Sequence, residues 1–289
     1  MKKKNKKNSS YSEAWRRLKK NKIAIISMIV VIVLIFIAIF ADLIVDYEVA
    51  IKQTGSLQLA KPSAQHWFGC DQLGRDLFAR VIHGSRVSLL LGFGTTIITT
   101  ILAVALGTSA AYYGGKFDNL LMRTFDILIS IPSVLLALAI SAGFGNGIVQ
   151  LMCAIIIGQL ASFTRVIRSA VLNLVDQEYI EAERAMGLND FRIIMTHIIP
   201  NAMGTILVQA TMQIARNILM GALLSFLGLG APIPTPEWGQ IASDGISCLR
   251  YTAHVVVFPT IFITTTALSI NLFGDGLRDA LDPRLKGRA

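Results

Sequence analysis

The sequence predicts an all-α membrane protein with six transmembrane helices. Apolar residues make up 53% of the 289 residues, charged residues only 16%, and the mean hydropathy is +0.59. A soluble domain usually carries about 25% charged residues. The apolar residues also form long blocks, one of which runs from 127 to 164 without a charge. Because roughly 20 apolar helical residues cross a bilayer, the blocks exclude a disordered chain and argue against a soluble one.

Six apolar segments are long enough to span a membrane. They cover residues 23–44, 87–112, 120–142, 148–168, 201–226 and 252–274. A basic tail over residues 1–22 precedes the first of them and holds ten Lys or Arg and one acidic residue. That first apolar stretch is longer than the core of a signal peptide and contains no Ala-x-Ala site. We therefore expect an uncleaved anchor over residues 23–45.

Positive charge marks one side of the predicted spans. Twenty Lys or Arg lie in the tail, around Lys116 and in the segments 165–200 and 276–289, whereas the opposite side holds six. Segments rich in Lys and Arg stay in the cytoplasm. We therefore expect both chain termini in the cytoplasm, and residues 46–86 and 227–251 outside.

Two short segments have the pattern of interfacial helices. Residues 12–21 would place apolar side chains on one face and Lys and Arg on the other, which suits a helix on the inner leaflet. Residues 71–83 also show helical spacing, with Gly84 as a stop. This second helix would lie on the outer surface before the second span, or pack on loops as an ordinary extracellular helix.

The sequence contains no recognisable enzyme motif. It has no GxxxxGK[ST] phosphate loop, no HExxH and no GxSxG. Three cysteines and four histidines are scattered without ligand spacing, so we predict no catalytic residue, no metal site and no bound cofactor. Cys70 and Cys248 would share the outer side, where we favour two separate apolar cysteines but leave a disulfide open.

The segment between the fourth and fifth spans, residues 169–200, predicts two short helices. Asp176 can cap a first helix over residues 177–186. Gly187 follows, where the left-handed turn that ends a helix favours a residue without a side chain.

Asn189 can cap a second helix over residues 190–199, which we expect to stop near Pro200. Two capped helices in a cytoplasmic loop indicate a surface that docks a partner. A DNA-binding helix-turn-helix is a weak rival, because the loop has few basic residues and is tethered at the bilayer.

This loop resembles the EAA–Gly–I-x-P loop of bacterial ABC importer permeases, in the residues Glu181-Ala182-Glu183, Gly187 and Ile198-Ile199-Pro200. Nearly the whole chain is similar to the second, C-type permease of dipeptide, oligopeptide and nickel importers. The further matching stretches are residues 67–76, 84–89, 126–132, 225–230 and 271–283. A single EAA match is weak, but the set in this order is specific.

The resemblance implies a type I ABC importer fold, with the transmembrane domain over residues 87–275. It implies a second homologous permease, two ABC ATPase subunits that use ATP and Mg, and an extracytoplasmic substrate-binding protein, in a bacterial plasma membrane. The chain would be a transport subunit, not an enzyme, in the pathway for di- or oligopeptides. The alternatives are a nickel or metal-chelate importer and, more remotely, a self-sufficient channel or secondary transporter.

The resemblance also assigns the ATPase-coupling residues. They are Glu181, Ala182, Glu183, Ala185, Gly187 and Pro200. At Glu183 the family pattern usually has a second alanine, so this side chain would either face solvent or add a salt bridge.

Two charges fall inside predicted spans, where an ionised group is costly and usually faces a cavity or a partner. Asp126 would be a gate charge or pair with Arg123 one turn earlier, and we favour the pair. Arg216 has no acidic residue near it in sequence. It would line the translocation path, where it could attract an anionic group, or pair with the partner permease.

Overall fold

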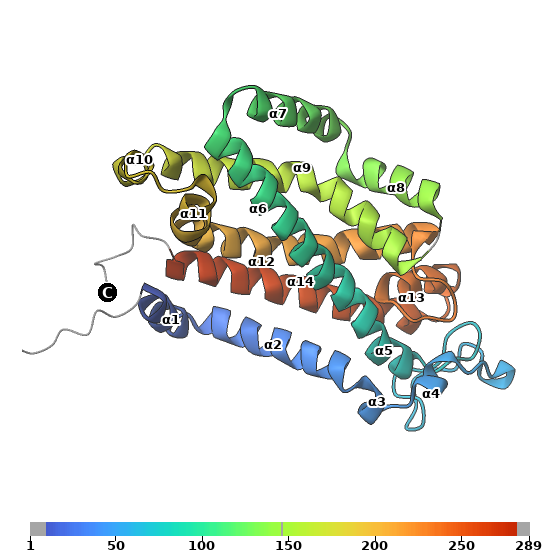
Figure 1. Cartoon of the computed structure of the whole chain (residues 1–289). Helices are drawn as coiled ribbons and strands as arrows, with labels where there is room; N and C mark the ends of the chain where they lie inside the picture. Colours follow the sequence, from blue (N-terminus) through green and yellow to red (C-terminus); the bar gives the residue numbers. More distant parts are fainter. Residues whose placement is uncertain (1–9, 146, 282–289) are drawn as a thin grey trace, which may run out of the picture.

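A computed structural model describes residues 10–145 and 147–281 (Figure 1). Within these residues the regular structure is helical, apart from one isolated bridge between Cys70 and Asp76. Five helices are long and apolar enough to cross a membrane, namely Lys22–Ile39, Leu77–Tyr113, Ile148–Val175, Asp190–Leu229 and His254–Leu281. The bent pair α7 (Gly115–Ser130) and α8 (Ser133–Phe144) supplies a sixth crossing if it counts as one span. The all-α prediction is confirmed.

The second span begins earlier than predicted. Helix α5 (Leu77–Leu89) starts at Asp76, whose carboxylate accepts a hydrogen bond from Ala79 N at 2.8 Å. It continues through a π-helical turn (Leu90–Gly94) into α6 (Thr95–Tyr113). The expected separate helix that stops at Gly84 is therefore wrong. A side chain at Gly84 would meet the Trp238 ring at 3.2 Å, so the glycine permits close packing within a continuous helix.

The third span is sharply broken. Helices α7 and α8 meet at an angle of 89°. The break lies at Pro132, and the residue before it, Ile131, is extended with φ −91° and ψ 126°. Proline disfavours the helical region for the residue that precedes it, which explains why the helix ends there.

The fifth span begins before Pro200 rather than after it. Helix α11 (Asp190–Ile193) continues through a π-helical turn (Ile194–Ile198) into α12 (Ile199–Leu224) and a second π-helical turn (Ser225–Leu229). The expected helix end near Pro200 is therefore wrong. Proline is tolerated because it lies at the start of α12, just after a wide turn that has already changed the hydrogen-bond register.

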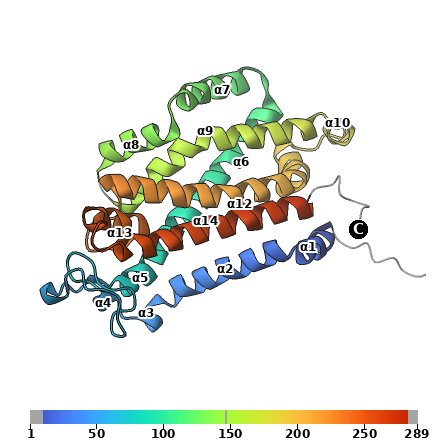
Figure 2. The same cartoon turned by 180° about the vertical axis from the view of Figure 1, so that it is seen from behind.

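Helices α9 (Ile148–Val175), α12 and α14 (His254–Leu281) run side by side, and α6 crosses one face of this layer (Figures 1 and 2). A Cβ atom at Gly107 of α6 would lie 2.8 Å from the carbonyl oxygen of Thr164, so glycine allows α6 and α9 to touch. Helix α2 (Lys22–Ile39) packs on α14 where Gly276 faces Ala24.

The predicted amphipathic helix near the N-terminus is present as α1 (Ser10–Lys20). Leu18 is buried against Ala24 and Ala280, whereas Trp15 is half exposed beside Lys19. Its apolar side chains are thus divided between the bundle and the surface. The tail over residues 1–9, and the C-terminal tail from residue 282, lie outside the described residues.

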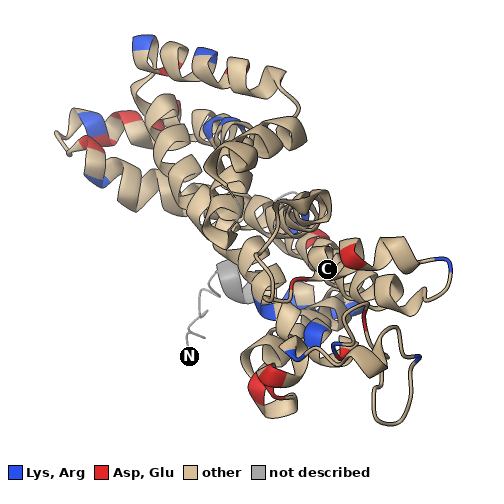
Figure 3. Ribbon diagram, turned by 90° about the vertical axis from the view of Figure 1, so that its right-hand side faces the viewer, with Lys and Arg blue, Asp and Glu red and all other residues tan. Residues whose placement is uncertain are grey.

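The segment between α2 and α5 contains the short helices α3 (Ala41–Ile44), α4 (Tyr47–Ile51) and a 3₁₀ turn (Gly55–Leu57). It packs beside α13 (Trp238–Gly245), which precedes another 3₁₀ turn (Ile246–Cys248). Figure 3 looks onto this end of the bundle, here called the α13 end, and shows acidic and basic residues close together. The opposite end carries α10 (Glu178–Ala185) and is called the α10 end.

Cys70 and Cys248 are both buried free thiols in this structure, so the disulfide left open from the sequence is not formed. Burial, with Asp76 and Asp71 nearby, raises the pKa of the Cys70 thiol to about 11. The thiol therefore stays protonated at neutral pH, in keeping with an apolar role.

Candidate functional site

The loop between α9 and α12 forms the two helices that the sequence predicts. Helix α10 ends at a turn in which Gly187 has φ +79°, and Gly187 N donates to Arg184 O at 2.9 Å. Such a left-handed residue after a helix favours glycine. The predicted cap at Asp176 is wrong, because Asp176 directly follows α9 and Gln177 precedes α10 without a side-chain cap.

The second cap is confirmed. The Asn189 side-chain oxygen accepts a hydrogen bond from Phe191 N at 3.0 Å and starts α11. The side chain satisfies a backbone N–H group that has no partner within the helix. The turn between α10 and α11 is thereby fixed at both of its ends.

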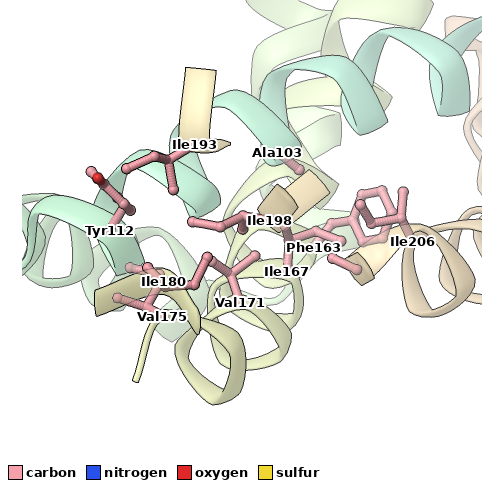
Figure 4. Packing of buried hydrophobic residues seen from close by; sticks show 12 residues of the cluster. Ala103, Tyr112, Phe163, Ile167, Val171, Val175, Ile180, Ile193, Ile198 and Ile206 are labelled. Carbon is pink, nitrogen blue, oxygen red and sulfur yellow. The ribbon is translucent and has the colours of Figure 1, made fainter. Parts of the chain in front are cut away.

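Helix α10 is anchored on the bundle by a buried isoleucine. Ile180 is fully buried in a hydrophobic cluster that includes Val171 and Val175 of α9, and Ile193 and Ile198 from the start of the fifth span (Figure 4). Burying one such side chain stabilises a contact by about 1.5–3 kcal/mol. The helix is therefore packed against the spans rather than suspended in a free loop.

A contact between Glu183 and His197 adds to this anchor. Glu183 Oε1 lies 2.8 Å from His197 Nδ1, and the Glu183 side chain is largely buried. Of the two alternatives weighed for Glu183, the structure has the contact rather than the solvent-facing carboxylate. The sequence does not identify His197 as the partner of Glu183, because His197 lies on the π-helical turn beyond α11 and not on the helix of Glu183.

Tyr112, at the end of α6, joins the loop from the other side. Its hydroxyl donates to Asp190 Oδ1 at 2.7 Å and accepts from Arg184 Nε at 3.3 Å. The Arg184 guanidinium also lies over the Tyr112 ring, 4.4 Å from its centroid. Helix α6 therefore meets α10 and α11, which are distant from it in sequence, at one phenol.

The outward side of α10 is free of such contacts. Four neighbouring residues are exposed and face away from the buried Ile180: Glu181, Ala182, Ala185 and Met186. Small and flexible apolar side chains beside a carboxylate make a surface on which another protein can approach closely. Pro200 is also exposed, but it lies on α12 rather than in the loop.

Asp126 lies on α7 and is half exposed. Its closest partner is Arg165 of α9, whose Nη2 donates to Oδ1 at 2.5 Å, whereas Arg123 Nη1 is 3.7 Å from the other oxygen. The favoured Arg123 pair is thus present, but a stronger one accompanies it. Arg168 holds Asp118 in the same way, so two ion pairs tie α7 to α9.

Arg216 is exposed on α12 and makes no ion pair with the residues that the structure describes. Its neighbour Asn217 is buried and donates to the hydroxyls of Thr95 and Thr96 of α6 at 2.8 and 3.0 Å. Asn217 therefore faces α6, and Arg216, about 100° away around the helix, points off to one side of that contact.

Arg216 shares its helix face with Thr205, Gln209 and Met212, at helical spacing. Exposed polar residues also recur on the neighbouring spans: Ser162, Ser169 and Asn173 on α9, and Thr260, Thr264 and Asn271 on α14. A hollow of about 510 Å³ between α9 and α12 is lined by Ser169, Asn173 and Thr205, with Val166 and Ala170. We call these polar stripes of α9, α12 and α14 the polar membrane face.

Comparisons with known proteins agree with this architecture. Residues 103–287 match the family of binding-protein-dependent transport system inner membrane components, and residues 9–62 match the N-terminal TM domain of oligopeptide transport permease C. The inward-facing MetNI methionine ABC transporter has a TM-score of 0.55 and 20% identity, covering 71% of this chain and 98% of that one. A second crystal form of that transporter has a TM-score of 0.57 and 19% identity, covering 70% of this chain and 96% of that one. These structures support the fold.

Two curated relatives are similar over nearly their whole length. The dipeptide transport system permease protein DppC of Alkalihalophilus pseudofirmus is 44% identical over 278 residues, covering 96% of this chain and 91% of the relative. The glutathione transport system permease protein GsiD of Escherichia coli O6:K15:H31 is 41% identical over 277 residues, with the same coverage. The chain therefore belongs to the binding-protein-dependent inner membrane components and is a permease subunit of an ABC importer, a transport subunit whose ATPase is a separate protein.

Proposed function

We propose that the chain forms one half of a peptide importer in a bacterial plasma membrane, with both termini in the cytoplasm. A second homologous permease would complete the pathway, and a substrate-binding protein would deliver the cargo from outside. ATP and Mg would be bound by two ATPase subunits, and this chain would hold no cofactor. The names of the two relatives support di- and tripeptides as cargo over nickel or a metal chelate.

The observation that carries this proposal is the geometry of α10. Its inner side is packed on the spans through Ile180, and its outer side presents Glu181, Ala182, Ala185 and Met186. A helix held in this way moves as one body with the spans when a partner displaces it. A self-sufficient channel or secondary transporter would not need such a docking helix.

The test is a gentle-detergent pull-down of the tagged chain with identification of the bound proteins. The wild-type chain is expected to retain a second permease and an ATPase. Glu181→Lys and Gly187→Asp should keep the permease and lower ATPase recovery at least tenfold, because each alters the α10 surface or its turn. Glu48→Lys, an equal charge reversal on exposed α4, should retain both partners. A wild-type chain that is recovered alone and moves solute without ATP would contradict the proposal.

We further propose that the polar membrane face lines the translocation path and that Arg216 attracts an anionic group of the cargo there. A charged residue on a span is stable where it faces a water-filled cavity rather than lipid. Arg216→Ala is expected to lower uptake of a radiolabelled dipeptide about tenfold while both partners are retained, whereas Arg123→Ala on exposed α7 should leave uptake unchanged. Loss of the second permease would instead assign Arg216 to pairing with it. Unchanged uptake would remove Arg216 from the path.

A further inference from the structure

We propose that Tyr112 passes the movement of α10 to the long helix α5–α6, so that this helix carries the ATPase signal to the α13 end. The inference rests on the proposed function, because it requires α10 to be the ATPase contact. The chain itself connects the loop directly to α9 and, through α11, to α12. Helix α6 is remote in sequence, so tertiary contacts couple it to the loop: it packs along α9, and at its end Tyr112 contacts α10 and α11 directly.

The Tyr112 hydroxyl is well suited to such a link. A phenol can donate and accept a hydrogen bond at the same time. Here it donates to Asp190 of α11 and accepts from Arg184 of α10, while the Arg184 guanidinium stacks on the ring. Tyr112 is only 7% exposed and its ring belongs to the same cluster as Ile180 (Figure 4). Both loop helices are thereby fixed to a single point on α6.

The end of α6 is able to move with the loop. Gly114 and Gly115 follow it directly, and both have φ +60°. A Cβ atom at either position would meet nothing within 4 Å, so the glycines serve the backbone turn rather than close packing. Helix α7 beyond them is held to α9 by its own ion pairs. The two glycines thus interrupt the helix between α6 and α7, so that a shift at the end of α6, beyond its close contact with α9 at Gly107, need not displace α7.

Helix α5–α6 reaches the opposite end of the molecule. It is helical from Leu77 to Tyr113, 37 residues, which corresponds to about 55 Å. At its far end the Trp238 indole of α13 donates to Val81 O at 2.8 Å, and Ser88 donates to Glu237 Oε1 at 3.0 Å. A displacement at Tyr112 is therefore transmitted to α13 through one continuous element with packed contacts at both ends.

Tyr113 provides a matched control. It is adjacent to Tyr112 and packs edge-on against its ring, but it is 58% exposed and its hydroxyl has no hydrogen bond to the residues that the structure describes. Tyr112→Phe and Tyr113→Phe each remove one hydroxyl and keep the ring. The Tyr112 change leaves Arg184 and Asp190 exposed to water, so the fold should persist.

The experiment uses the whole importer in proteoliposomes. It measures the retained ATPase subunits, the ATP hydrolysis stimulated by the binding protein, and the uptake of a radiolabelled peptide. The peptide is dialanine or glutathione, whichever the wild type takes up. Tyr112→Phe is expected to retain the ATPase and lower the uptake per ATP hydrolysed about five- to tenfold, since the hydroxyl makes two hydrogen bonds. Tyr113→Phe should match the wild type.

Equal uptake per ATP for wild type, Tyr112→Phe and Tyr113→Phe would overturn the inference while leaving the proposed function intact. Loss of the ATPase subunits in Tyr112→Phe would also overturn it, since Tyr112 would then shape the docking surface rather than transmit its movement. A wild-type chain that retains no ATPase would remove the proposed function itself, and the inference with it.

Discussion

The two ends of the bundle hold their loops to the spans in different ways. At the α13 end, Asp71, Arg75 and Arg80 are each 2% exposed and form an ionic cluster with Asp244. Asp71 also accepts hydrogen bonds from the backbone N–H groups of Leu73 and Arg75. At the α10 end, each contact has one partner that water can reach: Arg184 and Asp190 bind the buried Tyr112, and His197 contacts the largely buried Glu183.

This difference has a mechanical consequence. Removing one partner of a buried ion pair destabilises a protein by about 3–5 kcal/mol, whereas an exposed pair contributes about 0–1 kcal/mol. The α13 cluster therefore fixes the segment between α2 and α5, together with α13, against α5. At the α10 end a single polar contact costs less to break, because one of its partners reaches water, while the buried Ile180 and Tyr112 keep the loop attached to the spans.

The largest effect is expected at the α13 end. Asp71→Asn removes the carboxylate that faces both buried guanidinium groups, and Arg75 Nη1 and Arg80 Nη1 already lack a hydrogen-bond partner among the described residues. We expect the free energy of unfolding to fall by about 3–5 kcal/mol, measured by SDS titration of the purified chain. Glu48→Gln, on exposed α4, is the control and should change it little. Equal stability of the two variants would contradict this role of the α13 cluster.

An intermediate effect is expected in the turn after α10. Gly187→Ala meets no atom within 4 Å but must hold φ +79°, which costs about 1 kcal/mol for a residue with a side chain. The expected result is about a fivefold lower affinity for the ATPase and a fall of about 1 kcal/mol in the free energy of unfolding. Gly204→Ala, in open space within α12, serves as the control. Identical ATPase affinities for both variants would show that the turn does not set the docking angle.

The smallest effect is expected for Glu183→Ala, which restores the alanine of the family pattern. Its partner His197 has a side chain that is 37% exposed, and Glu183 Oε2 is buried without a hydrogen-bond partner among the described residues. Removing the carboxylate therefore also removes a desolvation cost, and the net loss should be less than about 1 kcal/mol. The variant should fold, retain the ATPase and transport at close to the wild-type rate. Because the two residues contact each other, the double variant with His197→Ala should cost no more than the larger single change. If Glu183→Ala lowered the free energy of unfolding by more than about 2 kcal/mol, the α10 end would be held as tightly as the α13 end.

The sequence predicts the parts of the fold that depend on local pattern. The spans follow from hydropathy, and the turn between α10 and α11 follows from Gly187 and Asn189, which act on their own backbone. Gly84 and Pro200 do not end helices, for two reasons that the local pattern does not reveal. Gly84 is explained by Trp238, more than 150 residues away, and Pro200 by the π-helical turn before it.

The candidate site shows the same limit. The exposed residues of α10 could be named from the loop pattern, but the side chains that hold the loop could not. Arg165 lies 39 residues from Asp126, and Asp190 lies 78 residues from Tyr112. Such pairs depend on the angles and positions at which α6, α7 and α9 pack against their neighbours. The spacing of residues along one helix carries no information about that packing.

The central claim is that α10 is the surface on which the ATPase docks. The most direct measurement places a photo-crosslinking amino acid at Ala185 and, as a control, at Leu249, which is exposed at the α13 end. On illumination of intact membranes, Ala185 is expected to crosslink to an ATPase subunit, and Leu249 is not. No ATPase adduct at Ala185, or equal adducts at both positions, would contradict it.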